Sequence, residues 1–243
     1  MELLLLSSSR TPAGYFTDYL PEIKRFTASV RRAVFIPFAA VSLSWQDYHK
    51  RVCDAIGIEL HSDGLESADL VVVGGGNTFQ LLRECRSRGL LEPIARRVRE
   101  GKSKYLGWSA GANLACPTIK TTNDMPIVDP DGLEALGLIG LQINPHYLNF
   151  SLPGHHGETR DDRLAEYARV NAGLPVLGLP EGDWLRVSSE RVELAGAHEA
   201  VWFEGEKTPV SVRPIARYEA GTWRSVASSN AAYEDQPFDR SPR

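Results

Sequence analysis

Ser109 is the residue of this chain best placed to do chemistry, because it lies at the centre of the pentapeptide Gly107-Trp108-Ser109-Ala110-Gly111. Between a strand and a helix, this Gly-x-Ser-x-Gly pattern presents a serine nucleophile on a sharp turn, and its glycines let neighbouring backbone pass. The N–H of Ala110 at the start of such a helix would face a developing oxyanion. The same residues also fit an ordinary turn with a serine N-cap, and the pentapeptide alone does not separate the two interpretations.

A serine nucleophile needs a base, and His146 is the best candidate among the six histidines of the chain. It directly follows an apolar stretch that reads as a strand, at residues 141–144. His155 and His156 lie in a glycine-rich loop and are weaker candidates. A lone histidine is more often structural than catalytic, so this assignment depends on Ser109 needing a base within hydrogen-bond reach.

Two carboxylates compete to orient that histidine. Glu181 comes just after the apolar strand-like run 176–179, and a carboxylate there could hold the imidazole in one tautomer. Asp124 is the rival acid, in a polar loop that follows the helix expected after Ser109. Each residue also fits the simpler role of a turn or cap carboxylate.

The glycine run Gly74-Gly75-Gly76 and the following Asn77 form a second candidate substrate-binding element. Consecutive glycines at a strand end allow close backbone approach to a ligand and leave N–H groups available. We therefore expect Gly75 and Gly76 to complete the oxyanion site, with Asn77 as a hydrogen-bond partner of the substrate. The alternative is a tight turn in which Asn77 or Thr78 caps the next helix.

Arg160 is expected near the start of a helix over residues 158–170, where the helix dipole disfavours a cation. This unfavourable place suggests a specific role, such as a bidentate clamp on a substrate carboxylate. A surface ion pair with Asp161 or Asp162 is the equally simple alternative.

The elements that must position these residues alternate along the chain. Strands are predicted at 3–6, 33–38, 70–73, 105–107, 141–144 and 176–179, and helices at 16–31, 43–56, 78–87, 91–101, 109–116 and 158–170. This alternation is typical of an α/β fold with a mostly parallel sheet and helices on both faces. In such folds, sites form beyond the carboxyl ends of the strands, where the glycine run, Ser109, His146 and Glu181 are expected.

After about residue 183 the pattern changes to short alternating segments separated by turns, which predict a small C-terminal antiparallel β meander appended to the sheet. Residues 225–243 are polar and are expected to form a loosely packed tail. We expect residues 1–243 to form a single domain, as a monomer or homodimer.

Composition excludes several classes of function. The net charge of −4 gives no electrostatic reason to expect nucleic acid as a partner, and no apolar stretch is long enough to span a membrane. Three widely spaced cysteines fit reduced thiols in a cytoplasmic protein. No His, Cys and carboxylate cluster has metal-ligand spacing, so we expect neither a metal nor another cofactor.

Taken together, these segments resemble the S51 serine peptidases known as peptidase E, which are α-aspartyl dipeptidases. The resemblance covers nearly the whole chain up to about residue 215. It is carried by several long motifs in one order, at residues 1–7, 33–39, 72–82, 107–117, 121–130, 142–146, 157–160 and 178–182.

The resemblance implies a glutamine-amidotransferase-like, flavodoxin-type fold and hydrolysis of dipeptides with an N-terminal aspartate, written Asp-X. It implies Ser109 as nucleophile and His146 as base. For the acid, Glu181 matches the glutamate of the triad proposed for the fold, and Asp124 matches an aspartate also assigned to the active site. We favour Glu181, since it follows a rigid strand and the order Ser-His-Glu mirrors the Cys-His-Glu of the amidotransferases. Asp124 would then pair with the substrate amine, and Arg160 would read the aspartyl side chain.

Two alternative functions stay open from the sequence. A cyanophycinase-like peptidase would keep the same triad and cut β-aspartyl bonds. A non-catalytic binding protein would keep only the scaffold, and the intact Ser109, His146 and Glu181 argue against it.

Overall fold

A nine-stranded sheet forms the centre of the protein in the computed structural model, which describes residues 1–150, 154, 156–189, 191–219 and 221–225. Its order is β15-β14-β11-β10-β1-β7-β6-β4-β5. The strands from β1 to β5 in this order are parallel, whereas β10, β11, β14 and β15 pair antiparallel. Their bounds are β1 (Glu2–Leu6), β4 (Ala33–Ile36), β5 (Leu60–His61), β6 (Leu70–Val73), β7 (Lys104–Trp108), β10 (Trp184–Ser188), β11 (Val192–Ala195), β14 (Ala216–Glu219) and β15 (Thr222–Ser225).

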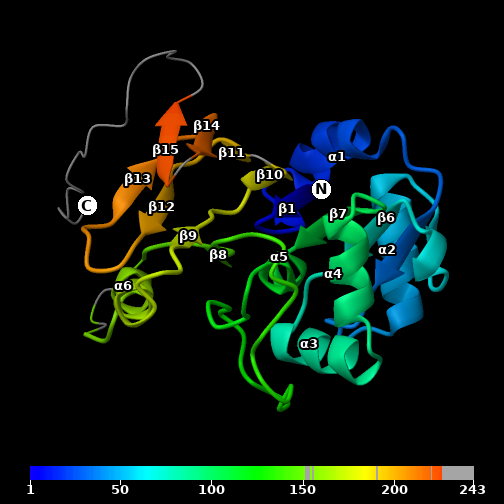
Figure 1. Cartoon of the computed structure of the whole chain (residues 1–243), viewed down its shortest axis with the longest axis horizontal. Coiled ribbons are helices and arrows are strands. Elements are labelled where there is room, and N and C mark those ends of the chain that lie inside the picture. Colours follow the sequence, from blue (N-terminus) through cyan, green and yellow to red (C-terminus); the bar gives the residue numbers. More distant parts are fainter. Residues whose placement is uncertain (151–153, 155, 190, 220, 226–243) are drawn as a thin grey trace.

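Helices cover both faces of the parallel half because its strands are apolar on both sides. Along β1, Leu3 and Leu5 pack in one cluster while Leu4 and Leu6 pack in the other. The first cluster lies under α3 (Thr78–Ser87), α4 (Leu91–Arg99) and α5 (Ala110–Ala115), and the second under α1 (Leu20–Thr27) and α2 (Trp45–Ile56). Figure 1 shows α2 and α4 against this half of the sheet, as the α/β prediction requires.

The strands predicted over 141–144 and 176–179 form, but in a different sheet from the one expected. β8 (Gln142–Asn144) and β9 (Val176–Gly178) are parallel neighbours in a four-stranded sheet of order β13-β12-β9-β8. The edge of β1 that they would need is occupied by β10, which pairs with β1 antiparallel over its whole length. The antiparallel segments are therefore divided between the sheets, since β12 (Ala200–Phe203) and β13 (Val210–Val212) extend the smaller one.

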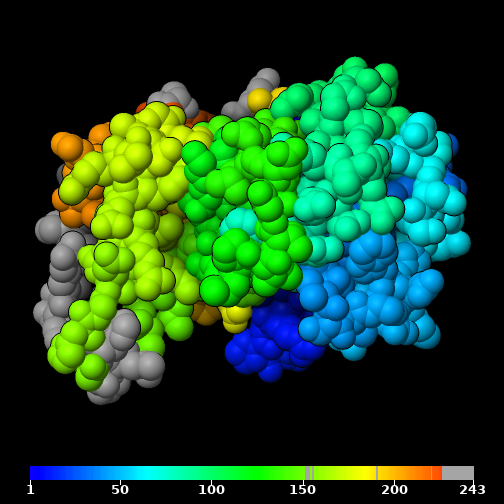
Figure 2. Space-filling view, turned by 90° about the horizontal axis from the view of Figure 1, so that it is seen from below, coloured from blue at the N-terminus to red at the C-terminus, as the bar shows by residue number. Residues whose placement is uncertain are grey.

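α6 (Arg160–Val170) packs on this second sheet through Leu164 and Ala168, which contact Val176 and Phe203 in a separate small core. Thr159 caps the helix with a reciprocal capping box to Asp162. In the space-filling view, the segment between α5 and β8 fills the centre between α6 and the helices α3 and α4 (Figure 2).

Several predicted element bounds differ from the structure. The helix expected over 16–31 is a 3-10 turn (Thr17–Tyr19) followed by the shorter α1, and the helix expected from 43 begins at 45 after its Ser44 cap. Very short strands were missed, namely β2 (Arg10–Thr11), β3 (Gly14–Tyr15) and β5, along with β14 and β15 and a 3-10 turn at Leu65–Ser67. Of the expected tail, only Ser225 falls within the described residues, as the last residue of β15.

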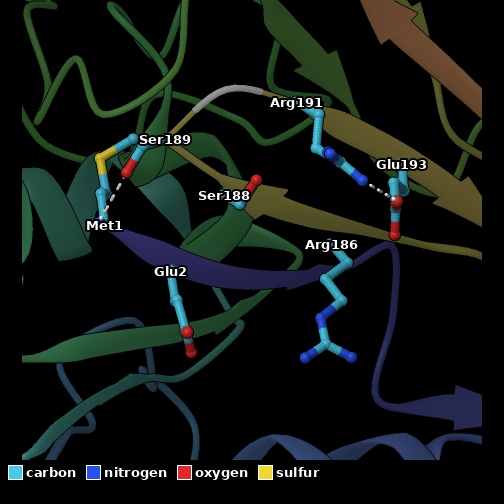
Figure 3. Close-up of a pocket in the computed structure, with 7 residues that line it drawn as sticks. All are labelled: Met1, Glu2, Arg186, Ser188, Ser189, Arg191 and Glu193. Carbon is cyan, nitrogen blue, oxygen red and sulfur yellow. Dashed lines mark hydrogen bonds and ion pairs between the residues drawn. The ribbon is translucent and has the colours of Figure 1, made fainter.

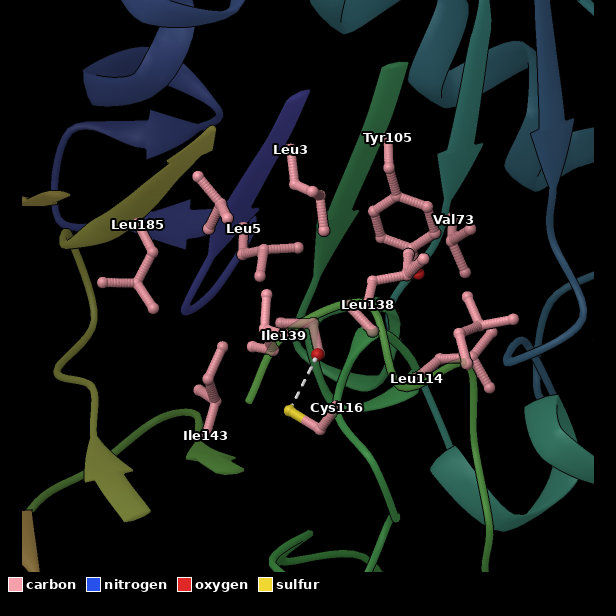
Figure 4. Packing of buried hydrophobic residues seen from close by; sticks show 14 of the residues in the cluster. Leu3, Leu5, Val73, Tyr105, Leu114, Cys116, Leu138, Ile139, Ile143 and Leu185 are labelled. Carbon is pink, nitrogen blue, oxygen red and sulfur yellow. Dashed lines mark hydrogen bonds between the residues drawn. The ribbon is translucent and has the colours of Figure 1, made fainter. Parts of the chain in front are cut away.

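The core beneath α5 joins the two sheets. Leu3 and Leu5 of β1, Ile143 of β8 and Leu185 of β10 gather there (Figure 4). Cys116 lies among them, and burial raises the pKa of its thiol to about 12, which keeps it protonated and inert. Within the described residues, no helix has the length and apolarity needed to cross a membrane, and no three His, Cys, Asp or Glu side chains gather as metal ligands.

Candidate active site

Ser109 sits on a sharp turn between β7 and α5, in a backbone conformation that is unfavourable for any residue with a side chain. Its φ of 52° and ψ of −113° lie outside the regions that L-residues favour. The flanking glycines make this turn possible. A Cβ on Gly107 would lie 2.6 Å from the carbonyl O of Gly111, and one on Gly111 would lie 2.2 Å from that of Val73. The Gly-x-Ser-x-Gly pattern is thus a steric requirement of this turn.

His146 and Glu181 complete a hydrogen-bonded chain with Ser109. The Nε2 atom of His146 lies 2.8 Å from Ser109 Oγ, and its Nδ1 atom lies 2.5 Å from Glu181 Oε1. The histidine follows β8 and the glutamate follows β9, so two parallel neighbours deliver the imidazole and the carboxylate to the same edge. A serine, a histidine and a carboxylate in this order are the groups that activate a hydroxyl for nucleophilic attack.

Ser7, at the carboxyl end of β1, joins this pair to the main sheet. Its hydroxyl donates to the carbonyl O of Leu179 at 2.8 Å and accepts from the backbone N–H of His146 at the same distance. Ser7 is fully buried, so both bonds are shielded from water. The sequence analysis missed this residue, although a polar residue directly after the apolar run 3–6 marks the same sheet edge.

Hydrogen bonds to buried polar groups hold the turn that carries Glu181. Gly182 N–H donates to the hydroxyl of Tyr19 at 2.8 Å. The carboxylate of Asp183 accepts from the backbone N–H groups of Ala197 and His198. Burial raises the pKa of the Asp183 carboxyl, while these N–H donors oppose the increase. The side chain of Glu181 itself is half-exposed, although the groups that hold its turn are buried.

Asp124, the rival acid, lies at the N-terminus of α3. Its Oδ2 atom accepts from the backbone N–H of Thr78 at 2.7 Å and from the hydroxyls of Thr78 and Thr122. The carboxylate found on His146 Nδ1 is that of Glu181. Asp124 nevertheless lines the same cleft as Ser109 and His146.

Asn77 performs the capping role that was the alternative for it. Its Oδ1 atom accepts from Gln80 N–H at 3.0 Å, and its Nδ2 atom donates to the carbonyl O of Met125 at 2.8 Å. Both ends of the amide are therefore occupied by the protein. The side chain also lines the cleft, and its contact with substrate stays a prediction.

The glycine run lies directly against the nucleophile. A Cβ on Gly75 would lie 3.1 Å from Ser109 Cβ and 2.8 Å from the indole of Trp108, and Gly76 has a φ of 140°. The hydrogen bonds described for this loop use the N–H groups of Gly74 and Asn77, and none uses those of Gly75 or Gly76. Ala110 is the first residue of α5, so its N–H has no acceptor within the helix. In the part of the chain that the structure describes, the N–H groups of Gly75, Gly76 and Ala110 therefore have no described acceptor, and they are candidates for the oxyanion site.

Arg160 is the first residue of α6 and is half-buried beside the base. Its Nη1 atom donates to the carbonyl O of His146 at 2.8 Å. Burial lowers the pKa of the guanidinium, and the neighbouring Arg163 lowers it further. Of the weaker histidine candidates, His156 is exposed and His155 lies outside the described residues.

A cleft of about 640 Å³ opens at this edge of the sheet. Its lining includes Ser109, His146 and Asp124 together with Gly75, Gly76 and Asn77. The sequence analysis did not identify the rest of its polar lining, which is Ser9, Arg10, Tyr15, Ser42, Tyr48 and Arg51.

Another hollow, of about 500 Å³, lies at the opposite edge, where β1 begins (Figure 3). Its two arginines are paired with carboxylates. Arg191 pairs with Glu193, Arg186 pairs with Glu22, and the N-terminal ammonium donates to Ser189 Oγ at 3.0 Å. Because it faces away from the carboxyl ends of the parallel strands, it is not the candidate site.

Known proteins match most of this chain in sequence. The sequence profile described as "Peptidase family S51" matches residues 3–195. The chain is 46% identical over 230 residues to peptidase E of Salmonella arizonae and 47% identical to peptidase E of Escherichia coli O6:K15:H31. Each of these alignments covers 90% of this chain and the whole of the relative.

Solved structures show the same fold at lower identity. A peptidase E protein from Listeria monocytogenes EGD-e superposes with a TM-score of 0.58 at 21% identity, over 81% of this chain and 98% of that one. A peptidase from an acI-B1 Actinobacterium gives a TM-score of 0.56 at 14% identity, over 90% and 96%. The family profile and the two relatives near half identity establish the assignment: this chain belongs to peptidase family S51.

Proposed function

We propose that the protein is a serine dipeptidase that hydrolyses Asp-X dipeptides through an acyl-enzyme on Ser109. The observation that carries the proposal is the chain of contacts from Ser109 Oγ to His146 Nε2 at 2.8 Å and from His146 Nδ1 to Glu181 at 2.5 Å. Membership of a peptidase family supplies the reaction type.

In the proposed reaction, the hydroxyl of Ser109 attacks the aspartyl carbonyl carbon while His146 Nε2 takes its proton. Glu181 stabilises the imidazolium and fixes its tautomer. Backbone N–H groups of Ala110 and of Gly75 or Gly76 bind the oxyanion, and losing one such donor typically costs roughly a hundredfold or more in kcat. His146 then gives its proton to the leaving amine. Water, activated by the same histidine, releases aspartate and restores Ser109.

We assign the aspartyl residue of the substrate to two charged groups, Arg160 and Asp124, of which Asp124 is among the residues that line the cleft and Arg160 is not. Arg160, held against the backbone of His146, binds the β-carboxylate. Asp124, which lines the cleft, pairs with the α-ammonium. The three hydrogen bonds that fix Asp124 Oδ2 hold its carboxylate in one orientation for this role.

The test is hydrolysis of Asp-Leu, Glu-Leu, Asn-Leu and β-Asp-Leu by the purified protein, with Ser109→Ala as the control. We expect cleavage of Asp-Leu alone, and none by the variant. Cleavage of β-Asp-Leu instead would point to a β-aspartyl peptidase on the same site. An inactive wild-type protein, with an unlabelled Ser109 after treatment with a serine-directed probe, would favour a binding role.

We further propose that the protein works in the cytoplasm, as a monomer or homodimer, without nucleic acid or membrane partners. Cys53, Cys85 and Cys116 are free thiols, as expected for a reducing compartment. Fractionation of cells and sedimentation of the purified protein test these two assignments directly.

A further inference from the structure

The cleft continues past Gly75 to a group of polar side chains that the proposed reaction does not use. The hydroxyl of Tyr48 donates to the carbonyl O of Gly75 at 3.0 Å, in the glycine run that lies against Ser109. Tyr15 and Arg10 come from the β2–β3 hairpin, where Arg10 lies over the ring of Tyr15 at 5.6 Å. Arg51 follows Tyr48 by three residues on α2, on the same side of the helix. All four line the cleft.

The charges in this lining are unbalanced. The lining holds two arginines, Arg10 and Arg51, and one acidic residue, Asp124. The cleft is therefore positive, although the whole chain has a net charge of −4. No ion pair of Arg10 or Arg51 occurs among the salt bridges of the described residues, whereas Lys50, which precedes Arg51 on the helix, pairs with Asp54 at 2.7 Å. Two arginines with no described carboxylate partner thus face a space that also holds the nucleophile.

The proposed substrate has the complementary charges. At neutral pH an Asp-X dipeptide carries an ammonium, a β-carboxylate and the α-carboxylate of its second residue. Asp124 and Arg160 account for the first two. We propose that Arg10 and Arg51 form a subsite for the third, the terminal carboxylate of the leaving residue. This inference rests on the proposed function, because it takes Asp-X as the substrate.

A subsite of this kind selects chain length as well as charge. In a dipeptide, the terminal carboxylate lies one residue beyond the scissile bond, within the cleft. Adding a residue moves that carboxylate away, and amidation removes its charge. The walls at Ala39, Ala40 and Leu43 are apolar and offer contact to the second side chain without selecting a charge. The subsite therefore specifies a two-residue substrate with a variable second residue.

The experiment measures kcat/KM on Asp-Leu, Asp-leucinamide and Asn-Leu. We expect the wild-type protein to prefer Asp-Leu over Asp-leucinamide by roughly tenfold, the effect of a charge-assisted hydrogen bond in an open cleft. Arg51→Gln and Arg10→Gln should each lower kcat/KM on Asp-Leu several-fold, mainly through KM, and leave Asp-leucinamide unchanged. Lys50→Gln is the matched control, since Lys50 is exposed on the same helix but outside the cleft. It should leave both substrates unchanged.

Unchanged turnover of Asp-leucinamide also shows that each variant is folded. Equal cleavage of Asp-Leu and Asp-leucinamide by the wild-type protein would overturn the subsite and leave the dipeptidase assignment standing. Arginine variants that lose discrimination between Asp-Leu and Asn-Leu would also overturn it, because these side chains would then read the aspartyl β-carboxylate. A wild-type protein that cleaves none of the three would overturn the proposed function itself, and the subsite with it.

Discussion

The nucleophile and the base belong to two regions that are built differently. Ser109 follows a strand in the middle of the main sheet, and its neighbours Trp108 and Ala110 are almost fully buried. His146 and Glu181 follow three-residue strands of the smaller sheet, with side chains 39% and 54% exposed. Ser109 and His146 both have a positive φ, of 52° and 54°, and such backbone persists only where surrounding packing over-determines it. The packing is closer around Ser109, whose neighbours are 1% exposed, than around His146, whose neighbour Tyr147 is 8% exposed. We therefore expect changes near Ser109 to alter stability and rate together, and changes near the base and acid to alter chiefly rate.

The largest effect should come from replacing the nucleophile. Both Ser109→Ala and Ser109→Gly should lower kcat by more than about 10⁴-fold, because the remaining groups cannot form the acyl-enzyme. Their stabilities should differ. Glycine adopts positive φ without strain, so Ser109→Gly should be the more stable variant by about 1 kcal/mol. Thermal unfolding measures the difference, and equal melting temperatures would show that the turn holds no strain.

The next effect separates the two acids. Glu181→Gln should lower kcat by roughly 10²–10⁴-fold, because the amide no longer stabilises the imidazolium of His146. The free energy of unfolding should change little, since Glu181 is half-exposed. Asp124→Asn should instead raise KM, because the neutral amide cannot pair with the substrate ammonium. It should change stability little, since an amide oxygen can still accept the N–H of Thr78. A larger loss of kcat in Asp124→Asn than in Glu181→Gln would reverse the assignment of the acid.

A glycine variant tests the packing of the nucleophile region. In Gly111→Ala the new Cβ would lie 2.2 Å from the carbonyl O of Val73, and this contact is with backbone that cannot rotate away. We expect a loss of at least about 2–3 kcal/mol in the free energy of unfolding, with loss of activity. Gly140→Ala is the control, because nothing lies within 4 Å of its added Cβ. Similar stabilities for both variants would contradict the tight strand-to-helix contact.

The smallest effect should come from the junction between the regions. Ser7→Ala leaves the buried N–H of His146 and carbonyl O of Leu179 without their shared partner. The cost should be roughly 1–3 kcal/mol of stability. Turnover should also fall several-fold as the imidazole loses its alignment, while KM should hardly change. Unaltered kcat in a destabilised variant would show that Ser7 serves only the fold.

Most of this arrangement could be predicted from the sequence. The remaining parts could not be predicted, for physical reasons. Ser109, His146 and Glu181 each follow an apolar strand, which is a local signal, and the structure places their side chains in contact. The division into two sheets was not predictable from local pattern, because it depends on β10 taking the free edge of β1. The role of Asn77 could not be predicted for a different reason. An asparagine at this position fits capping of the next helix and contact with a ligand equally well.

The single hydroxyl of Ser7 also bears on how the protein is made. It contacts residues 139 and 172 positions further along the chain. A nascent chain that has grown past the serine turn therefore carries a nucleophile without its base, and the carboxylate follows only after β9, the second strand of the smaller sheet along the chain. Such distant pairings close late in folding. We therefore expect growing chains to cut no peptides until residue 181 has been synthesised, because the serine, the histidine and the carboxylate are together only from that point.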